Sequence, residues 1–396
     1  MSGAPGSRAA PASGRSVAVA AFAAAVIVAT GFIVVGLLPE MARNLGVSLA
    51  GAGAYVSWFA VSAALLGPPL TIAAGGIRPR RVLVAVLLVF AAGNLACVLA
   101  PGHAVVLAVR VVQGAVLPVF VSVAGVAVVG LAGPGREGRA LAGINAGVVA
   151  GLVLAVPAGV ALAGRAGWPA SFLGLAALAT LAALAVGAAF PDMGGPDRRP
   201  VRGQVGLFRQ PGFPAHLLLS ATLFAATFAA YTYLAAYLET VFGLGAEGVG
   251  LALMGFGIAG LAGNWAAGRV VDRGPTAATA GVAAVLALAM AAVPAAGAQA
   301  VLAVPLLAVW GAAHAAAFVL CQVRVMLAGS VAPAFAMSLN ISASNLGIAC
   351  GAALGGWAVE RWGIVNVGLA GAMPAVLAFG LAVLVGLRAP RVRPAG

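Results

Sequence analysis

Long apolar runs alternate with short polar joints along the whole chain. A helix needs roughly 20 apolar residues, at a rise of about 1.5 Å each, to cross a bilayer. Twelve runs reach that length, and their approximate limits are 16–38, 50–74, 80–100, 104–131, 138–163, 168–190, 212–238, 247–271, 276–294, 299–327, 334–359 and 364–387. The pattern predicts an all-α integral membrane protein with twelve transmembrane helices.

The longest polar interruption covers residues 191–211 and divides the runs into two sets of six. We therefore expect six-helix bundles at 16–190 and 212–388, joined by a central cytoplasmic loop. Residues 1–15 are rich in Pro, Gly, Ser and Ala, which predicts a disordered cytoplasmic tail rather than a cleaved signal peptide. Residues 389–396 form the second cytoplasmic tail.

The two halves repeat one another at an offset of 196 residues. Related positions carry the same residue in the pairs Gly67 and Gly263, Pro79 and Pro275, Gly151 and Gly347, Gly159 and Gly355, Arg165 and Arg361, and Gly167 and Gly363. Parallel six-helix repeats with a binding site at their interface are typical of transporters. The sequence thus predicts two pseudo-symmetric six-helix bundles.

Charge is sparse and unevenly placed. The chain is 63% hydrophobic and 7% charged, whereas charged residues make up about a quarter of a soluble domain. Its 21 basic residues are all Arg: sixteen lie in the tails and even-numbered joints, three in odd-numbered joints and two within runs. The distribution of these Arg predicts that both termini lie in the cytoplasm. The net charge of +13 therefore reflects membrane topology and does not indicate binding to nucleic acid. The lack of Lys in an Ala-, Gly- and Val-rich chain indicates a GC-rich bacterium, and hence its cytoplasmic (inner) membrane.

Enzymatic chemistry and cofactors are not indicated. Cys97, Cys321 and Cys350 lie within apolar runs and have no metal-ligand spacing, so we expect no metal and no disulfide. A phosphate loop needs Lys, which excludes a primary pump on this chain. An intramembrane enzyme would need a catalytic constellation, but the chain has three His and no buried acid pair. We expect a monomer that contacts lipid, protons and a small-molecule substrate.

Arg110 is the only charge in the run 104–131. An Arg at mid-membrane depth costs about 2.5 to 3.5 kcal/mol on insertion scales, so its side chain must face protein or water. Gln113 lies one turn further on nearly the same face, and Gly114 lets a neighbouring helix approach closely. The alternative is an Arg that only holds helices together through their backbone carbonyls.

A second set of candidates lies in the second half. Trp310, His314, Phe318 and Gln322 recur every four residues and form one stripe. His314 changes charge near neutral pH, since the ordinary pKa of His is about 6.5, so it suits ligand contact or proton transfer. The alternative is plain packing. The seventh run places Phe224, Thr227 and Tyr231 on one face, which favours an aromatic cavity for amphipathic molecules.

The remaining polar candidates are few. Asn145 and Asn340 are expected to be buried, either in the substrate pathway or in hydrogen bonds between helices. Glu40 and Glu239 lie near the outer ends of runs 1 and 7, as proton acids or as plain interfacial residues. No Asp or Glu lies at mid-membrane depth in any run.

Several segments together resemble one branch of a known family. They are Gly36-Leu-Leu-Pro-Glu40, Arg110-Val-Val-Gln113-Gly114, Tyr231-Thr-Tyr233, Leu238-Glu239-Thr240 and the segment 338–347. Over about residues 16–388 the chain resembles the drug–proton antiporter branch of the major facilitator superfamily, which includes bacterial arabinose, purine-nucleoside and chloramphenicol exporters. The resemblance implies export of small amphipathic compounds by proton antiport, and it ties Arg110 to proton transfer. Gly147-x-x-x-Gly151 and Ala155-Val-Pro157-Ala-Gly159 resemble the antiporter motif of run 5.

The family's cytoplasmic gate motif, Gly-x-x-x-Asp-Arg followed by basic residues, is altered in both halves. Gly268-Arg-Val-Val-Asp272-Arg273 keeps its core. Arg78-Pro-Arg80-Arg81 keeps only the basic end, because Gly75 or Gly76 stands where the acid belongs. In the family this acid braces a helix end and locks the outward-open state. The alternative for all these Arg is their topological role alone.

One further departure concerns coupling. Related antiporters carry a Glu just before Phe in run 1, where this chain has Gly31-Phe32. If proton antiport operates, another group must carry the proton, and His314 is the candidate, with Glu40 and Glu239 as rivals. The alternative is a facilitator or importer of the same fold without proton coupling.

Overall fold

The computed structural model describes residues 14–132, 136–194, 207, 210 and 212–388. Within these ranges twelve helices are long and apolar enough to cross a membrane, which confirms the predicted fold class. The tails 1–13 and 389–396, and most of the expected central loop, lie outside the described residues.

The first half contains α1 to α7 and one π-helix turn. The bounds are α1 (Gly14–Leu45), α2 (Leu49–Ala73), α3 (Pro79–Leu99), α4 (His103–Ala132), α5 (Glu137–Ala150), the π-helix η1 (Gly151–Ala155), α6 (Val156–Ala166) and α7 (Trp168–Ala189). Together α5, η1 and α6 form the fifth span.

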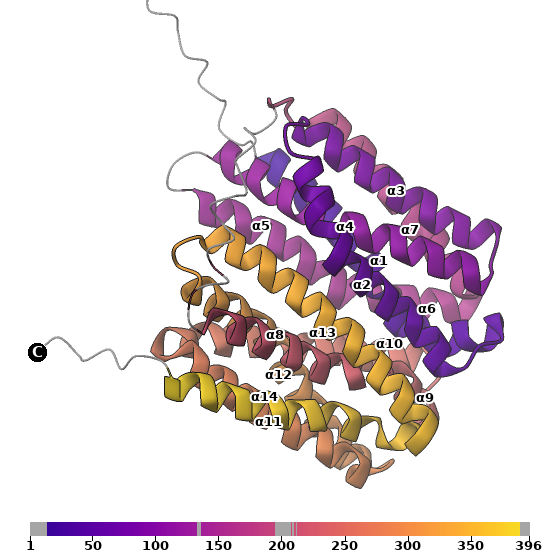
Figure 1. Cartoon of the computed structure of the whole chain (residues 1–396). Coiled ribbons are helices and arrows are strands. Elements are labelled where there is room, and N and C mark those ends of the chain that lie inside the picture. The colour runs from indigo at the N-terminus through magenta and orange to yellow at the C-terminus, as the bar shows by residue number, and fades with distance from the viewer. Residues whose placement is uncertain (1–13, 133–135, 195–206, 208–209, 211, 389–396) are drawn as a thin grey trace, which may run out of the picture.

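The second half runs from α8 to α14. Its elements are α8 (Phe213–Tyr231), α9 (Leu234–Phe242), α10 (Ala246–Val270), the 3-10 turn η4 (Val271–Arg273), α11 (Pro275–Ala296), α12 (Ala300–Ala328), α13 (Pro333–Trp362), the 3-10 turn η5 (Ile364–Asn366) and α14 (Val367–Arg388). The two halves lie side by side in Figure 1, with the start of α1 and the end of α14 at the same end of the molecule. We call this the inner end, and the opposite end, with the turns at Gly46, Gly167, Gly243 and Gly363, the outer end.

Three spans depart from the sequence prediction in their course or by several residues. α1 continues through Pro39 to Leu45, although the sequence pattern ended it at residue 38. The fifth span contains η1 directly before Pro157, where an extra residue in the turn relieves the clash of the Pro ring with the preceding carbonyl. The seventh span breaks at Thr232 and Tyr233 into α8 and α9.

The repeat appears in the packing of the spans. A Cβ atom at Gly151 would meet the backbone carbonyl of Ala25, and one at Gly347 would meet that of Ala221. Both residues of the second pair lie 196 positions after their counterparts. Each half therefore packs its fifth span against its first through the same small residue, which lets the two backbones approach closely.

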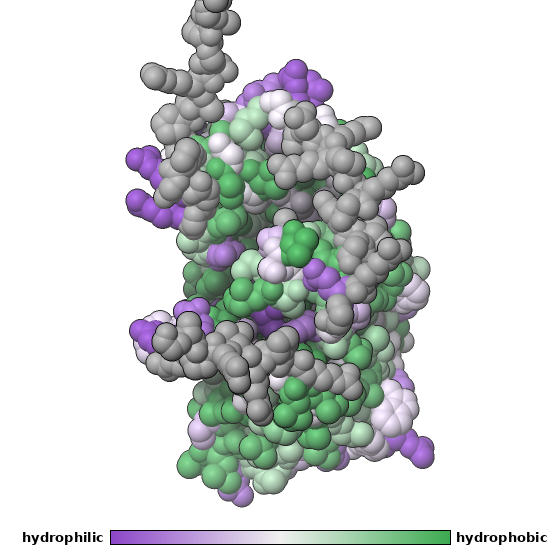
Figure 2. Space-filling model, turned by 60° about the vertical axis from the view of Figure 1, so that its left-hand side comes forward, coloured by the Kyte–Doolittle hydropathy of each residue, from purple (hydrophilic) through white to green (hydrophobic). Residues whose placement is uncertain are grey.

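Buried apolar residues join the two halves only toward the outer end of the described structure. The largest core cluster contains residues of both halves, such as Leu38, Val160 and Leu253. Nearer the inner end, one cluster draws only on the first half and two draw only on the second. Figure 2 turns the inner end forward and shows hydrophilic side chains in a recess between the apolar halves. The halves are thus closed together at the outer end.

Candidate functional site

Arg110 is fully buried inside the first half and ties three helices together. From α4, its guanidinium donates hydrogen bonds to the backbone oxygens of Thr30 at 2.9 Å and Gly31 at 2.6 Å in α1. Its Nε donates to the backbone oxygen of Tyr55 in α2 at 3.3 Å, and the guanidinium lies 4.0 Å over the ring of Phe59. All of these partners are neutral, so the positive charge has no carboxylate beside it.

Gln113 extends this contact into a buried polar network that the sequence did not reveal. Its Oε1 lies 3.5 Å from Nη1 of Arg110, and its Nε2 donates to Oδ1 of Asn94 at 3.0 Å. Asn94 reaches Oγ1 of Thr30 at 3.4 Å. Asn94 is an amide within an apolar run, and this feature of the sequence could have marked it as a candidate site residue. The network locks the orientation of Arg110.

His314 lies at the centre of an aromatic cluster in the second half. Its ring centroid is 4.7 Å from that of Tyr231, 5.5 Å from Phe228, and 5.6 Å from each of Phe256 and Phe318. The imidazole is buried, and its Nδ1 has no hydrogen-bond partner among the described residues. The stripe of His314 and Phe318 is therefore part of a larger aromatic site, to which Phe228 and Phe256 were not predicted to belong.

Trp310 joins the same cluster through Phe256, with ring centroids 5.4 Å apart in an edge-to-face arrangement. Thr227 is buried, and its hydroxyl donates to the backbone oxygen of Phe224 at 3.0 Å. Gln322 continues the stripe toward the inner end, where its side chain is exposed.

The polar network and the aromatic cluster meet at Gly31-Phe32. The backbone oxygen of Gly31 accepts a hydrogen bond from Arg110, and the ring of Phe32 lies 6.0 Å from that of Phe228. Sequence-distant candidates in the two halves are thus connected through one dipeptide of α1. This junction is the centre of the candidate site.

The two predicted Asn residues differ in their surroundings. Asn145 is exposed on α5, so the expectation that it is buried is wrong. Apolar residues surround it in sequence, but the face of the fifth span that packs against α1 is that of Gly147 in α5 and Gly151 in η1. Asn340 is buried as expected, and its Oδ1 has no partner among the described residues.

Three polar contacts connect the halves at the outer end. Arg43 forms an ion pair with Glu239 at 2.6 Å, Arg165 pairs with Glu247 at 2.6 Å, and Ser48 donates to Glu360 at 2.8 Å. Glu40 has a different role: its Oε1 accepts a hydrogen bond from the backbone N–H of Trp168 at the start of α7, at 2.7 Å. Glu40, Arg43 and Glu239 line a cavity of about 80 Å³ between the halves.

The gate motifs lie at the inner end. Arg78 pairs with Asp192 just after α7, at 2.6 Å, so the first half receives an acid from another segment in place of the missing one. Arg80 is half-buried, and Arg81, Gly268 and Asp272 are exposed. Asp272 forms no ion pair within the part of the chain that the structure describes, and the side chain of Arg273 is outside it.

A second buried Arg was not predicted to be a site residue. Arg324 in α12 donates from Nη1 to the backbone oxygen of His216 at 3.0 Å and from Nη2 to Oγ of Ser220 at 2.8 Å. Nη1 also lies 2.9 Å from Nδ1 of His216. Like Arg110, it has only neutral partners, and it connects a helix of its half, α8, to α12, although its Nε has no hydrogen-bond partner among the described residues.

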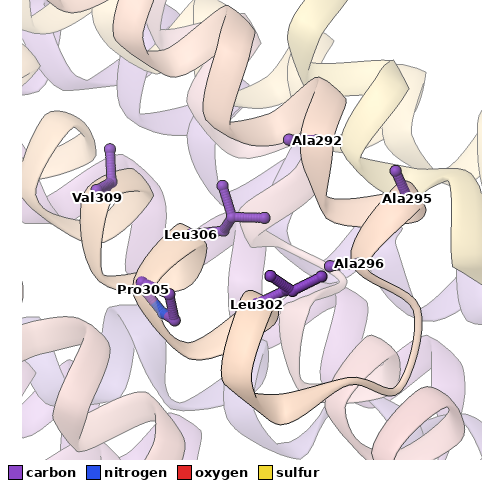
Figure 3. A pocket seen from close by; sticks show the side chains of 7 residues that line it. All are labelled: Ala292, Ala295, Ala296, Leu302, Pro305, Leu306 and Val309. Atoms are coloured by element: carbon purple, nitrogen blue, oxygen red, sulfur yellow. The ribbon is translucent and has the colours of Figure 1, made fainter.

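One apolar groove of the described structure lies apart from this site. It measures about 430 Å³ and lies at the outer ends of α11 and α12, lined by Ala292, Ala295, Ala296, Leu302, Pro305, Leu306 and Val309. Figure 3 shows these apolar side chains facing one another from the two helices. With no polar side chain to orient a ligand, it lacks the features of a specific site.

Comparison with known proteins agrees with this architecture. The profile of the Major Facilitator Superfamily matches residues 20–332. The chain is 28% identical to the inner membrane transport protein YdhP of Escherichia coli K12 over 92% of this chain and 93% of that protein. It is 31% identical to a chloramphenicol resistance protein of Streptomyces lividans over 81% and 83% of the two chains.

Solved structures share the fold. A bacterial homologue of the human lysosomal transporter Spinster, in an inward-facing and occupied conformation, has a TM-score of 0.80 at 15% identity, covering 96% of this chain and 98% of that one. The nucleoside transporter NupG has a TM-score of 0.73 at 15% identity, covering 95% and 99%. The chain is therefore a multi-pass inner-membrane transporter that belongs to the Major Facilitator Superfamily.

Proposed function

We propose that this transporter exports small amphipathic compounds from the bacterial cytoplasm by alternating access, in exchange for protons. Its inner end, with both termini, faces the cytoplasm, as the distribution of Arg predicts. The observation that carries the proposal is the arrangement of contacts between the halves. Polar bridges and a shared core close the outer end, whereas the buried clusters near the inner end belong to single halves.

This arrangement supports uptake of the substrate from the inner side. Rocking of the two halves about the central junction would break exposed contacts such as Arg43 to Glu239, whose side chains are 61% and 36% exposed. Exposed ion pairs contribute only about 0 to 1 kcal/mol each to stability, so they need not hold the transporter in one conformation. The direction of export is supported by the name of a 31% identical relative, a chloramphenicol resistance protein.

The aromatic cluster supports an amphipathic substrate. Rings from α8, α10 and α12 supply apolar area, and a few polar atoms such as Nδ1 of His314 and Nε1 of Trp310 supply hydrogen bonds. Pockets of this composition suit drug-like and nucleoside-like molecules. The test is to compare the accumulation of a panel of such compounds in cells with and without the gene. Equal accumulation of every compound would contradict export.

We further propose that His314 carries the exchanged proton. We expect His314→Gln, reconstituted in liposomes, to lose substrate transport driven by a pH gradient while still exchanging substrate down its own gradient. The reason is that Gln keeps a hydrogen-bonding side chain of similar reach but cannot change charge near neutral pH. The measurement is substrate flux together with the pH of the liposome interior.

The matched controls are Glu40→Gln and Glu239→Gln, which remove the rival titratable groups at the outer end. Both should keep proton-linked transport. Coupling that survives His314→Gln but disappears in one of the Glu variants would move the role to that acid. Flux of the unmutated protein that does not respond to a pH gradient would instead favour a facilitator.

A further inference from the structure

The centre of the site offers hydrogen bonds without negative charge. Besides Nε of Arg324, which lies nearer the inner end, four buried polar atoms on α12 and α13 have no partner among the described residues. They are Nε1 of Trp310 and Nδ1 of His314 in the aromatic cluster, and Oδ1 of Asn340 and Oγ of Ser344 on α13. Buried polar groups are normally paired, so unpaired ones in a transporter core are candidates for ligand contact. All four belong to neutral groups when His314 is unprotonated.

The acids whose side chains the structure describes lie at or near helix ends, away from the aromatic cluster. The sequence contains eight, which occupy helix ends and joints: Glu40, Glu137, Asp192, Asp197, Glu239, Glu247, Asp272 and Glu360. Glu239 and Glu247 at the outer end already pair with Arg43 and Arg165. A positively charged substrate would therefore find no carboxylate of the described residues at the centre.

A fixed positive charge borders the centre instead. The guanidinium of Arg110 donates to the backbone oxygen of Gly31, and the next residue, Phe32, contacts the aromatic cluster. Arg110 is fully buried and has only neutral partners, so its charge is not cancelled by a neighbouring acid. In a medium of low dielectric constant, such a charge repels a second cation over several ångströms.

We infer that this transporter accepts neutral aromatic amphipathic compounds and discriminates against organic cations. The inference rests on the proposed function and specifies the substrate class of the same site. Transfer of a cation to membrane depth is unfavourable unless an opposite charge receives it, and here the nearest fixed charge has the same sign.

The aromatic rings do not reverse this preference. Aromatic cages bind quaternary ammonium groups through cation–π contacts when the rings surround the cation. Here the rings of Phe228, Tyr231, Phe256 and Phe318 already surround His314, and Phe59 is already covered by Arg110. His314 therefore fills the space between these rings, and a substrate must bind beside it.

The test uses pairs of aromatic amides that differ only in one group, tert-butyl in one member and trimethylammonium in the other. These groups have nearly the same shape, so the pair isolates charge. Flux of both members is measured in proteoliposomes of the full chain with the membrane potential clamped to zero, over several aromatic scaffolds. We expect the neutral member to be transported at least about tenfold faster, a ratio that corresponds to about 1.4 kcal/mol.

Gly31→Glu provides the converse variant. A Cβ at Gly31 would meet only the ring tip of Phe59, at 3.7 Å, which is an ordinary contact. The new carboxylate would lie beside Arg110 and next to the aromatic cluster, so it should raise the flux of the trimethylammonium member and reduce the ratio. Gly31→Gln has the same size without the charge and should leave the ratio unchanged.

The possible results distinguish failure of the discrimination against cations from failure of the proposed function. If the unmutated protein transports the cationic member as fast as the neutral one, the discrimination against cations is wrong, while export of aromatic amphipaths stands. If a Gly31→Gln change reduces the ratio as much as Gly31→Glu does, size rather than charge controls selectivity, and the inference also fails. If neither member of any pair is transported, the proposed function itself is contradicted.

Discussion

Replacement of Arg110 by Ala is expected to reduce export at least about tenfold, equivalent to about 1.4 kcal/mol of lost stabilisation of the transport cycle. Arg110 positions α1, α2 and α4 through Thr30, Tyr55 and Gly31, and Gly31 precedes the residue that contacts the aromatic cluster. Its loss therefore releases the helix that connects the two halves of the site. The measurement is efflux of a substrate identified in the accumulation panel, normalised to the amount of protein in the membrane.

Two effects on folding oppose each other in this variant, so export is compared per molecule of protein in the membrane. The substitution removes hydrogen bonds from a charged donor, about 1.5 to 3 kcal/mol each, but it also removes the cost of about 2.5 to 3.5 kcal/mol for a charge at membrane depth. Arg110→Lys is the control: it keeps the charge but cannot reach three carbonyl oxygens at once. Full activity of Arg110→Ala would reduce Arg110 to a residue that merely holds helices together, and normal activity of Arg110→Lys alone would show that charge rather than geometry matters.

Gly347→Ala is expected to destabilise the second half. The added Cβ would meet the backbone oxygen of Ala221, which belongs to α8, and would lie 2.9 Å from Cβ of Phe224. Backbone cannot rotate away as a side chain can, so α8 and α13 must separate. Overpacking of this kind costs about 1 to 3 kcal/mol, which should lower the thermal midpoint of the purified protein by several degrees, about 2 to 4 °C per kcal/mol.

Gly380→Ala in α14 is the matched control, since a Cβ at Gly380 would meet nothing within 4 Å. Ala is also the better helix former, so this variant should be as stable as the unmutated protein or slightly more so. Gly151→Ala should behave like Gly347→Ala, because its Cβ would meet the backbone oxygen of Ala25 in the first half. Equal stability of Gly347→Ala and Gly380→Ala would show that the contact between α8 and α13 is looser than the structure indicates.

The helices of this fold can be predicted from hydropathy because lipid imposes one rule on every span: its backbone must be hydrogen-bonded internally and its side chains must be apolar. The limits of α2, α3 and α7 therefore differ from the predicted runs by one residue at most. Local exceptions escape the rule. Pro39 removes one backbone hydrogen-bond donor, yet α1 continues past it. A transmembrane helix tolerates Pro because neighbouring helices can satisfy the freed backbone group.

The break at Thr232 and Tyr233 lies beside a contact with a residue far along the chain, which the sequence pattern does not show. The hydroxyl of Tyr233 donates to the backbone oxygen of Ala352 at 2.8 Å, 119 residues away. The candidate site shows the same limit. Periodicity placed His314 and Phe318 on one face of a helix, but the rings of Phe228 and Phe256 come from α8 and α10. Asn94, from α3, likewise joins the site through its contacts with Gln113 and Thr30.

The ion pair of Arg43 and Glu239 limits how the chain could have evolved. The two residues are 196 positions apart, so they occupy equivalent places in the first span of each half. Two identical six-helix chains assembled with this symmetry would bring Arg against Arg, or Glu against Glu, at the point where the outer end closes. Like charges at that distance oppose closure. A symmetric ancestor could not have closed in this way, so this contact became available only after the two copies were free to diverge within one polypeptide.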